Sequence, residues 1–163
     1  MQQELPGTLK VLTVWLLIGA AIFLGIQWWQ RESTQTRFKL DGEVVELQRG
    51  RDGHYHWPGS VNGQAVDFLV DTGASGTAIS AGLARELGLE SMGVVQSQTA
   101  GGSAVGKIVV ADLALHGGVR IDRMRLIALP ALGERPLLGM DVLGRLRWQQ
   151  VDGVLRVDLS TRR

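Results

Sequence analysis

Short apolar runs separated by tight-turn signals are the feature that most constrains the fold of this chain. Asp52-Gly53, Asn62-Gly63 and Asp152-Gly153 are dipeptides that favour two-residue hairpin turns, and His116-Gly117-Gly118 separates two further runs. The runs between these turns are short and rich in Val, Ile and Leu. Many short strands at such spacing are typical of an all-β barrel or sandwich. We therefore predict an all-β domain.

The strands and helices of this domain can be placed approximately. The expected strands cover residues 43–48, 54–57, 66–70, 107–115, 119–129, 148–150 and 154–159. A first short helix is expected after Ser80, a suitable N-cap, with Gly88 as its stop. A second begins near Met140, directly after the segment Pro136-Leu137-Leu138-Gly139. The prediction is thus a barrel with one or two short helices.

An uncharged apolar run lies near the amino terminus. Residues 11–29 carry no charged side chain, and their number is enough for one bilayer crossing. Trp15 and Trp28-Trp29 lie toward the two ends of the run, as in an interfacial aromatic belt. A cleaved signal peptide and a buried core helix are the alternatives, but residues 27–32 offer no small-residue cleavage site. We predict a single transmembrane helix over residues 11–29.

The domain organisation follows from this run. We expect an N-terminal stub over 1–10, the transmembrane helix over 11–29, a polar tether over 30–40 and the β-domain over 41–163. More basic residues follow the apolar run than precede it, which by itself favours a cytoplasmic domain. However, long domains can cross regardless of charge, and a short stub before a first span commonly stays inside. We therefore expect the amino terminus inside and the domain outside.

Composition excludes several function classes. The 163 residues carry a net charge of +1 and no cysteine. Scattered cations without a basic patch do not fit nucleic-acid binding, so we expect no nucleic-acid partner. Without cysteine, disulfides and thiolate metal sites are impossible. A metal site of His54, His56 and His116 is conceivable, but His-x-His without a nearby carboxylate or cysteine is more typical of a strand surface, and we expect no metal and no cofactor.

The candidate for chemistry is a single Asp71-Thr72-Gly73. It follows the apolar run Val66–Val70, so the carboxylate is expected on the turn after a buried strand. An ordinary turn aspartate is the alternative interpretation. The other aspartates considered lack the Thr-Gly that follows Asp71, and none is expected to be catalytic: Asp112, Asp122, Asp141 and Asp152.

Three segments together resemble a known family. They are Phe68-Leu-Val-Asp-Thr-Gly-Ala-Ser75, the Gly-rich Gln98-Thr-Ala-Gly-Gly-Ser103, and Leu137-Leu-Gly139 leading into a helix. In this order and spacing the chain resembles retropepsin-like aspartic proteases, most closely a bacterial membrane-anchored branch with an Asp-Thr-Gly-Ala motif. The resemblance covers roughly residues 44–159. It implies a retropepsin-like acid protease barrel, and with the apolar run it implies anchoring in a bacterial inner membrane with the domain in the periplasm.

The resemblance also implies an activity and a partner. One Asp71 per chain implies that two chains meet and that their two carboxylates form the catalytic dyad. Two such groups share one proton, and the pair activates a water that hydrolyses a peptide bond. The substrate would be an extended polypeptide paired to the cleft as an added strand.

The resemblance assigns roles to further residues. Thr72 is expected to fix the dyad by a hydrogen bond across the two-fold axis, and Gly73 to allow close approach, while Ala74 and Ser75 line the cleft. The expected flap residues are Thr99, Ala100, Gly101 and Gly102, and a plain Gly-rich surface loop is the alternative. Leu138 and Gly139 are expected to support the active site from below.

One departure concerns assembly. Many retroviral enzymes carry an acidic residue and an arginine that pair near the active site, and Ser75 and Met140 occupy those two positions here. A weaker soluble dimer is expected, and membrane anchoring could compensate by raising the local concentration of protomers. Two other function classes stay open: a catalytically silent peptide-binding or dimerisation module on the same fold, and a purely structural membrane-tethered domain.

Overall fold

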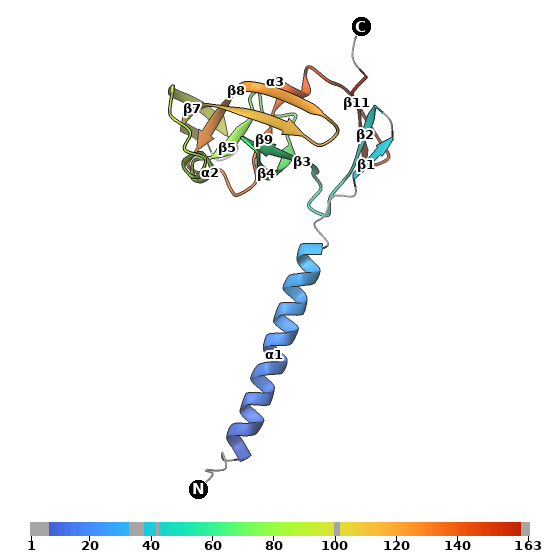
Figure 1. Ribbon diagram of the computed structural model, residues 1–163, viewed down its shortest axis with the longest axis vertical. Helices are drawn as coiled ribbons and strands as arrows, with labels where there is room; N and C mark the ends of the chain where they lie inside the picture. The colour runs from blue at the N-terminus through green and yellow to red at the C-terminus, as the bar shows by residue number, and fades with distance from the viewer. Residues whose placement is uncertain (1–6, 33–37, 42, 100–101, 161–163) are drawn as a thin grey trace. The chain divides into compact units, whose positions relative to one another are not determined.

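The computed structural model describes two separate units of this chain. Residues 7–32, 38–41, 43–99 and 102–160 are described, with side chains for 11–26, 43–98 and 102–160. Unit 1 covers 1–35 and unit 2 covers 36–163 (Figure 1).

The described residues of unit 1 form one helix, α1 (Gly7–Glu32), of 26 residues. Every side chain described on it, from 11 to 26, is exposed. Over the described residues, no helix of the structure is both long and apolar enough to cross a membrane.

The polar tether predicted over 30–40 is shorter than expected. Helix α1 takes in Gln30–Glu32 at one end, and strand β1 (Phe38–Asp41) takes in three residues at the other. Strand β1 pairs antiparallel with β2 (Val44–Gln48), and this pairing gives the polar segment before the domain a regular structure. Residues 33–37 lie outside the described part of the chain.

Unit 2 contains a four-stranded antiparallel sheet in the order β1-β2-β11-β10. Strands β10 (Arg147–Val151) and β11 (Val154–Asp158) form a hairpin. Alternate residues of β2 and β11 are buried: Val45, Leu47, Leu155 and Val157. This sheet therefore presents one face to the core and one to solvent, as the alternating pattern of an antiparallel sheet requires.

The second sheet of unit 2 has seven strands in the order β3-β4-β9-β5-β8-β7-β6, and an additional β3–β7 pairing closes it. Its strands are β3 (Tyr55–Val61), β4 (Gln64–Val70), β5 (Ala78–Ser80), β6 (Gly93–Thr99), β7 (Gly102–Leu115), β8 (Val119–Leu129) and β9 (Leu137–Leu138). The pairs β4–β9 and β5–β8 are parallel, and the others are antiparallel. The predicted all-β barrel is thus confirmed.

The turn signals place most of these strands correctly. At Asn62-Gly63 and Asp152-Gly153 both residues have positive φ, as a type I′ hairpin turn requires, and the turns join β3 to β4 and β10 to β11. The third signal, Asp52-Gly53, instead links two different sheets, with only an isolated bridge between Arg49 and Tyr55. Strands β5 and β6 were not predicted.

Two short helices accompany the sheets. Helix α2 (Ala81–Glu86) starts at Ser80, whose side chain accepts a hydrogen bond from the Leu83 N–H at 3.0 Å, so the predicted cap is confirmed. Helix α3 (Met140–Leu143) is a single turn.

The core fixes the strand that precedes Asp71. Phe68 of β4 lies opposite Trp57 of β3, and both side chains are completely buried. Trp57 Nε1 also donates to the His116 carbonyl at 2.8 Å, which ties β3 to the β7–β8 turn. Each such side chain stabilises the fold by roughly 1.5–3 kcal/mol through burial. Strand β4 is therefore held by β3 along its length and by β9 at its last two residues.

Candidate active site

Asp71 lies directly after β4, between the strands that flank it. The Leu69 N–H donates to the Pro136 carbonyl at 2.8 Å, and the Asp71 N–H donates to the Leu138 carbonyl at 3.0 Å. These bonds continue the parallel β4–β9 pairing by one residue beyond the strand. The backbone of Asp71 is therefore positioned by β9 and not only by its own strand.

The turn after Asp71 is organised around its carboxyl group. Asp71 Oδ1 accepts a hydrogen bond from the Gly73 N–H at 2.8 Å, and the Asp71 carbonyl accepts one from Ala74 N–H at 3.3 Å. Asp71 is half-buried, whereas Thr72 and Gly73 are exposed. A partly exposed carboxylate held by a backbone donor is suited to proton transfer with a water molecule. The dyad role of Thr72 and the cleft roles of Ala74 and Ser75 stay predictions.

Gly139 lies against the turn at a distance that only glycine permits. A Cβ on this residue would lie 2.5 Å from the carbonyl carbon of Gly76 and 3.0 Å from the Ala74 oxygen. The next residue, Met140, donates its N–H to the same Ala74 oxygen at 2.8 Å. Leu138, beside it, is completely buried. Gly139 thus lies in contact with the turn that follows Asp71, and the supporting role of Leu138 and Gly139 stays a prediction.

A further connection, between Thr77 and Asp141, was missed by the sequence analysis. The Thr77 hydroxyl donates to Asp141 Oδ1 at 2.7 Å, and the Thr77 N–H donates to Asp141 Oδ2 at 2.9 Å. The same hydroxyl accepts the Gly139 N–H at 3.1 Å. Thr77 is completely buried, so it joins the end of the turn to α3 inside the protein. The signal available in the sequence was Asp141, an acidic residue two positions after Gly139 of the Leu-Leu-Gly segment.

The predicted flap falls on the β6–β7 hairpin. Thr99 pairs with Gly102 at its tip, and Gln96 Nε2 donates to the Ser103 hydroxyl at 2.8 Å across the two strands. Ala100 and Gly101 lie outside the described residues. A two-stranded hairpin is compatible with the predicted flap, and its movement over a substrate stays a prediction.

The three histidines do not meet. His54 is exposed, His56 is buried beside Asp52 and Asp67, and His116 lies in the β7–β8 turn. Within the described part of the chain, no group of three or more His, Asp or Glu side chains is arranged to hold a metal ion.

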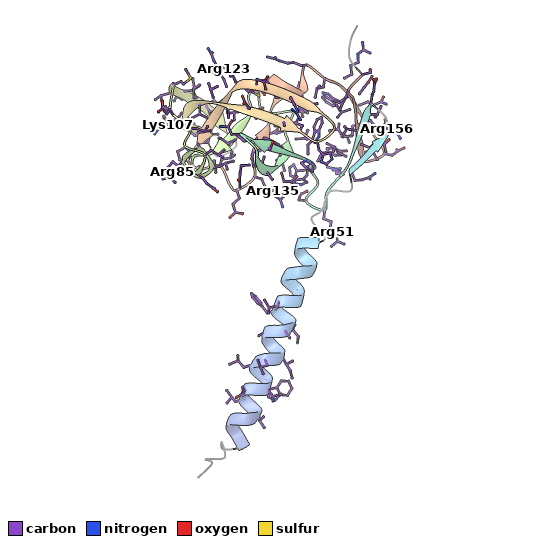
Figure 2. All side chains as sticks on the ribbon, viewed as in Figure 1. Arg51, Arg85, Lys107, Arg123, Arg135 and Arg156 are labelled. Atoms are coloured by element: carbon purple, nitrogen blue, oxygen red, sulfur yellow. The ribbon has the colours of Figure 1, made fainter. Side chains whose placement is uncertain are left out.

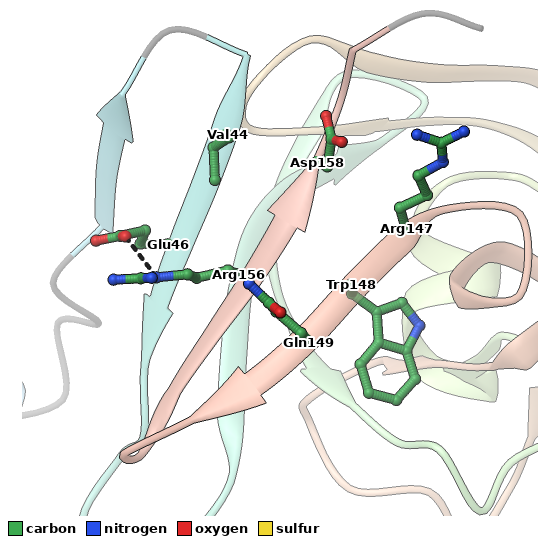
Figure 3. A pocket seen from close by; sticks show the side chains of 7 residues that line it. All are labelled: Val44, Glu46, Arg147, Trp148, Gln149, Arg156 and Asp158. Carbon is green, nitrogen blue, oxygen red and sulfur yellow. Dashed lines mark ion pairs between the residues drawn. The ribbon is translucent and has the colours of Figure 1, made fainter.

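A hollow on the four-stranded sheet lies outside the predicted site (Figure 3). It is lined by Val44, Glu46, Arg147, Trp148, Gln149, Arg156 and Asp158. Arg156 Nε and Glu46 Oε1 form an ion pair of 2.9 Å across it. None of its lining residues belongs to the Asp71 turn. Arg156 is one of several basic residues that lie on different segments of unit 2 and are labelled in Figure 2.

Comparison with known proteins agrees with this geometry. A solved retropepsin-like aspartic protease from Rickettsia conorii superposes with a TM-score of 0.58 at 24% identity, covering 71% of this chain and 99% of the other. An uncharacterized protein in the cobV 5' region of Sinorhizobium sp is 29% identical over 113 residues, or 67% of this chain. The chain spans about half the length of that relative, 48%.

The family match covers the elements that build the site. The profile of the gag-polyprotein putative aspartyl protease family matches residues 57–145, more than half of the chain. This range contains β4, the Asp71 turn, the β6–β7 hairpin and α3. The chain therefore belongs to the gag-polyprotein aspartyl protease family and has the retropepsin-like fold.

Proposed function

We propose that this protein is an aspartic endopeptidase whose catalytic dyad consists of Asp71 from each of two copies. The observation that carries the proposal is the fixed position of Asp71, whose N–H is held by the Leu138 carbonyl and whose Oδ1 accepts the Gly73 N–H. The sequence offers a single Asp-Thr-Gly, and in this proposal the second carboxylate comes from a second copy.

The chemistry follows from two carboxyl groups at close range. They cannot both ionise easily, so the pair retains one proton over a range of pH. The ionised group takes a proton from water while the protonated group donates to the scissile carbonyl oxygen. The water oxygen bonds to the carbonyl carbon. In the resulting tetrahedral species the C–N bond breaks as the nitrogen takes the proton that the dyad received from water, and the amine and the acid are released. We expect a bell-shaped pH profile, and a rate still rising through pH 9 would contradict it.

The substrate proposed is an unfolded or loop segment of a polypeptide. An extended peptide can pair with backbone groups near Ser75 as an added strand, while the β6–β7 hairpin closes over it. Thr72 would then connect the two dyad halves across the two-fold axis.

The first test compares wild type with Asp71→Asn on a randomised peptide library from pH 4 to 8. The amide oxygen introduced by this substitution can still accept the Gly73 N–H, so the turn is expected to fold. Loss of the general acid–base pair should lower turnover by about 10²–10⁴-fold or more. At high dilution the wild-type rate should rise with the square of enzyme concentration. Asp122→Asn, an exposed carboxylate on β8, is the matched control and should cleave normally.

The outcomes separate the alternatives. A silent binding module would capture peptides equally well before and after Asp71→Asn, and would cleave none in either form. A structural protein would do neither. Equal cleavage by wild type and Asp71→Asn would contradict the aspartic mechanism.

We also propose that α1 anchors the protein in a bacterial inner membrane, with unit 2 in the periplasm. Its support is the uncharged run of residues 11–29 in the sequence and the exposure of the side chains described on α1, although over the described residues alone no helix is long and apolar enough to cross a membrane. Leu17→Arg places a charge at mid-helix, which costs roughly 2.5–3.5 kcal/mol in a bilayer. We expect this variant to leave the membrane fraction on alkaline extraction, while Val94→Arg on exposed β6 stays in it. Equal extraction of both variants and wild type would contradict anchoring by α1.

A further inference from the structure

A buried imidazole that the proposed hydrolysis does not use lies beside the strand leading to Asp71. His56 of β3 is only 2% exposed. Its Nε2 lies 2.8 Å from Asp52 Oδ2, and its Nδ1 lies 3.3 Å from Asp67 Oδ2. Nδ1 is buried and makes no hydrogen bond of good geometry. The ring is therefore enclosed between two carboxylates, one on each side.

Other charged or titratable groups lie close to these two carboxylates. Arg135 Nη1 lies 3.1 Å from Asp52 Oδ2, and the exposed His54 lies 4.0 Å from Asp52 Oδ1. Asp67 comes from β4. With His54 neutral, a neutral His56 leaves two carboxylates facing one guanidinium, an excess of one negative charge. One additional proton makes the group of Asp52, His56, Asp67 and Arg135 neutral.

The geometry favours that proton between His56 Nδ1 and Asp67 Oδ2. Because Asp52 Oδ2 accepts a hydrogen bond from His56 Nε2, a neutral ring carries its only proton on Nε2. The lone pair of Nδ1 then faces Asp67 Oδ2. His56 Nδ1 and Asp67 Oδ2 lie 3.3 Å apart, so their lone pairs repel each other. A proton on either atom removes this repulsion. Burial raises the pKa of Asp67, although the charges of His56 and Arg135 partly offset this. The protonated arrangement is thus favoured under mildly acidic conditions.

The group is connected to the Asp71 turn through backbone contacts. Asp67 lies on β4 four residues before Asp71, and His56 pairs with Leu69 of the same strand. Leu69 in turn donates to the carbonyl of Pro136, the residue after Arg135. The group therefore joins β3, β4 and the segment that enters β9, which together position Asp71.

We propose that His56 is a positioning residue that holds one proton between Asp52 and Asp67, and that this proton keeps β4 and β9 aligned around Asp71. Loss of the proton places unbalanced negative charge between β3 and β4, and the Asp71 turn loses its alignment. The effect on catalysis rests on the proposed function, whereas the proton itself and the alignment do not.

The test is a histidine NMR titration of the full-length protein in detergent micelles. The chain has only three histidines, so single substitutions assign them. At mildly acidic pH one proton should lie between His56 Nδ1 and Asp67 Oδ2, and the Gly73 amide shift should change as the pH rises and that proton is lost. In Asp67→Asn the side-chain amide can donate to Nδ1, so the ring should stay neutral and the Gly73 titration should disappear. Asp122→Asn, the matched control, should behave as wild type.

Cleavage gives a second, independent readout. The basic limb of the kcat/KM profile should shift by about half a pH unit in Asp67→Asn, a threefold change in relative rate, and not in Asp122→Asn. A neutral His56 beside an ionised Asp67 in the wild type at mildly acidic pH would overturn the proposal, as would a Gly73 titration that is identical in Asp67→Asn. If Asp67→Asn does not fold, His56→Gln should likewise abolish the Gly73 titration. Absence of cleavage in every variant would defeat the proposed protease, and the NMR titration would still decide this inference.

Discussion

At the scale of single residues, the site depends on polar groups and close contacts that surround Asp71 rather than on Asp71 alone. Thr77 makes hydrogen bonds to Asp141 and to the Gly139 N–H while completely buried. The Gly139 N–H is buried and Asp141 is half-buried, and a buried polar group that loses its hydrogen-bond partner keeps the cost of its lost solvation. Thr77 is therefore the residue at which a small change should disturb the turn most.

Thr77→Val should show this directly. The substitution preserves shape but removes the hydroxyl, leaving the Gly139 N–H and Asp141 Oδ1 without a partner, at a cost of about 1–3 kcal/mol in unfolding free energy. Thr77→Ser keeps the hydroxyl and should retain most of that stability. Urea unfolding of both variants measures the difference. Equal stability of the two would mean that the hydroxyl contributes nothing.

At the scale of elements, the base of the β6–β7 hairpin packs closely against β8 at Gly106. A Cβ on Gly106 of β7 would lie 2.8 Å from Ile127 Cγ2 and 2.9 Å from Leu129 Cδ2, both on β8. The opposite face of the hairpin is exposed, including Val94 and Val105. The base of the predicted flap is therefore seated tightly, while its outer face is open to solvent.

Gly106→Ala should displace this hairpin. Overpacking at its base should cost about 1–3 kcal/mol and lower kcat/KM, because the proposed flap would no longer close correctly. Gly93→Ala on the paired strand β6 is the matched control, since its Cβ would meet nothing closer than Ile108 Cδ1 at 3.9 Å. Differential unfolding and cleavage assays of the two variants check this. An equally stable and active Gly106→Ala would show that the base tolerates movement.

At the scale of the whole molecule, stability should depend on pH in two directions. Burial acts to raise the pKa of Asp52, but hydrogen bonds from the His54 backbone and the His56 ring outweigh it and lower the pKa below 3.8. Its stabilisation is present above 3.8 and is lost as the pH falls. Burial raises the pKa of Asp67, so its contribution is complete below 3.8 and is lost as the pH rises through the raised value.

The urea midpoint of the full chain should therefore be highest at mildly acidic pH. It should fall toward pH 3 as Asp52 becomes protonated and fall again toward neutrality as Asp67 ionises. In Asp67→Asn the fall of the urea midpoint toward neutrality should disappear, while the fall toward pH 3 remains. In Asp122→Asn the urea midpoint should fall in both directions, as in wild type. A wild-type midpoint that climbs steadily from pH 4 to pH 8 would contradict this account.

The sequence by itself determined those features whose cause is local. Asn62-Gly63 and Asp152-Gly153 have the positive φ that their residues favour, and Ser80 caps the helix that follows it. The Asp-Thr-Gly turn directly follows its apolar strand. These features are local because strand, turn and cap preferences act between residues that are close in the sequence. Strand β6 was missed because its Gln, Ser and Thr residues resemble a loop until β7 pairs with them.

Only the tertiary structure decided the contacts between distant segments. Thr77 and Asp141 are 64 positions apart in the sequence. No local pattern specifies that the Asp141 carboxylate accepts hydrogen bonds from both the N–H and the hydroxyl of Thr77. His56 was considered as a metal ligand or a strand-surface residue, yet packing encloses it between Asp52 and Asp67. Such contacts depend on strand register and on which sheets close together. Register is set by burial across the whole domain, so neighbouring residues cannot determine it.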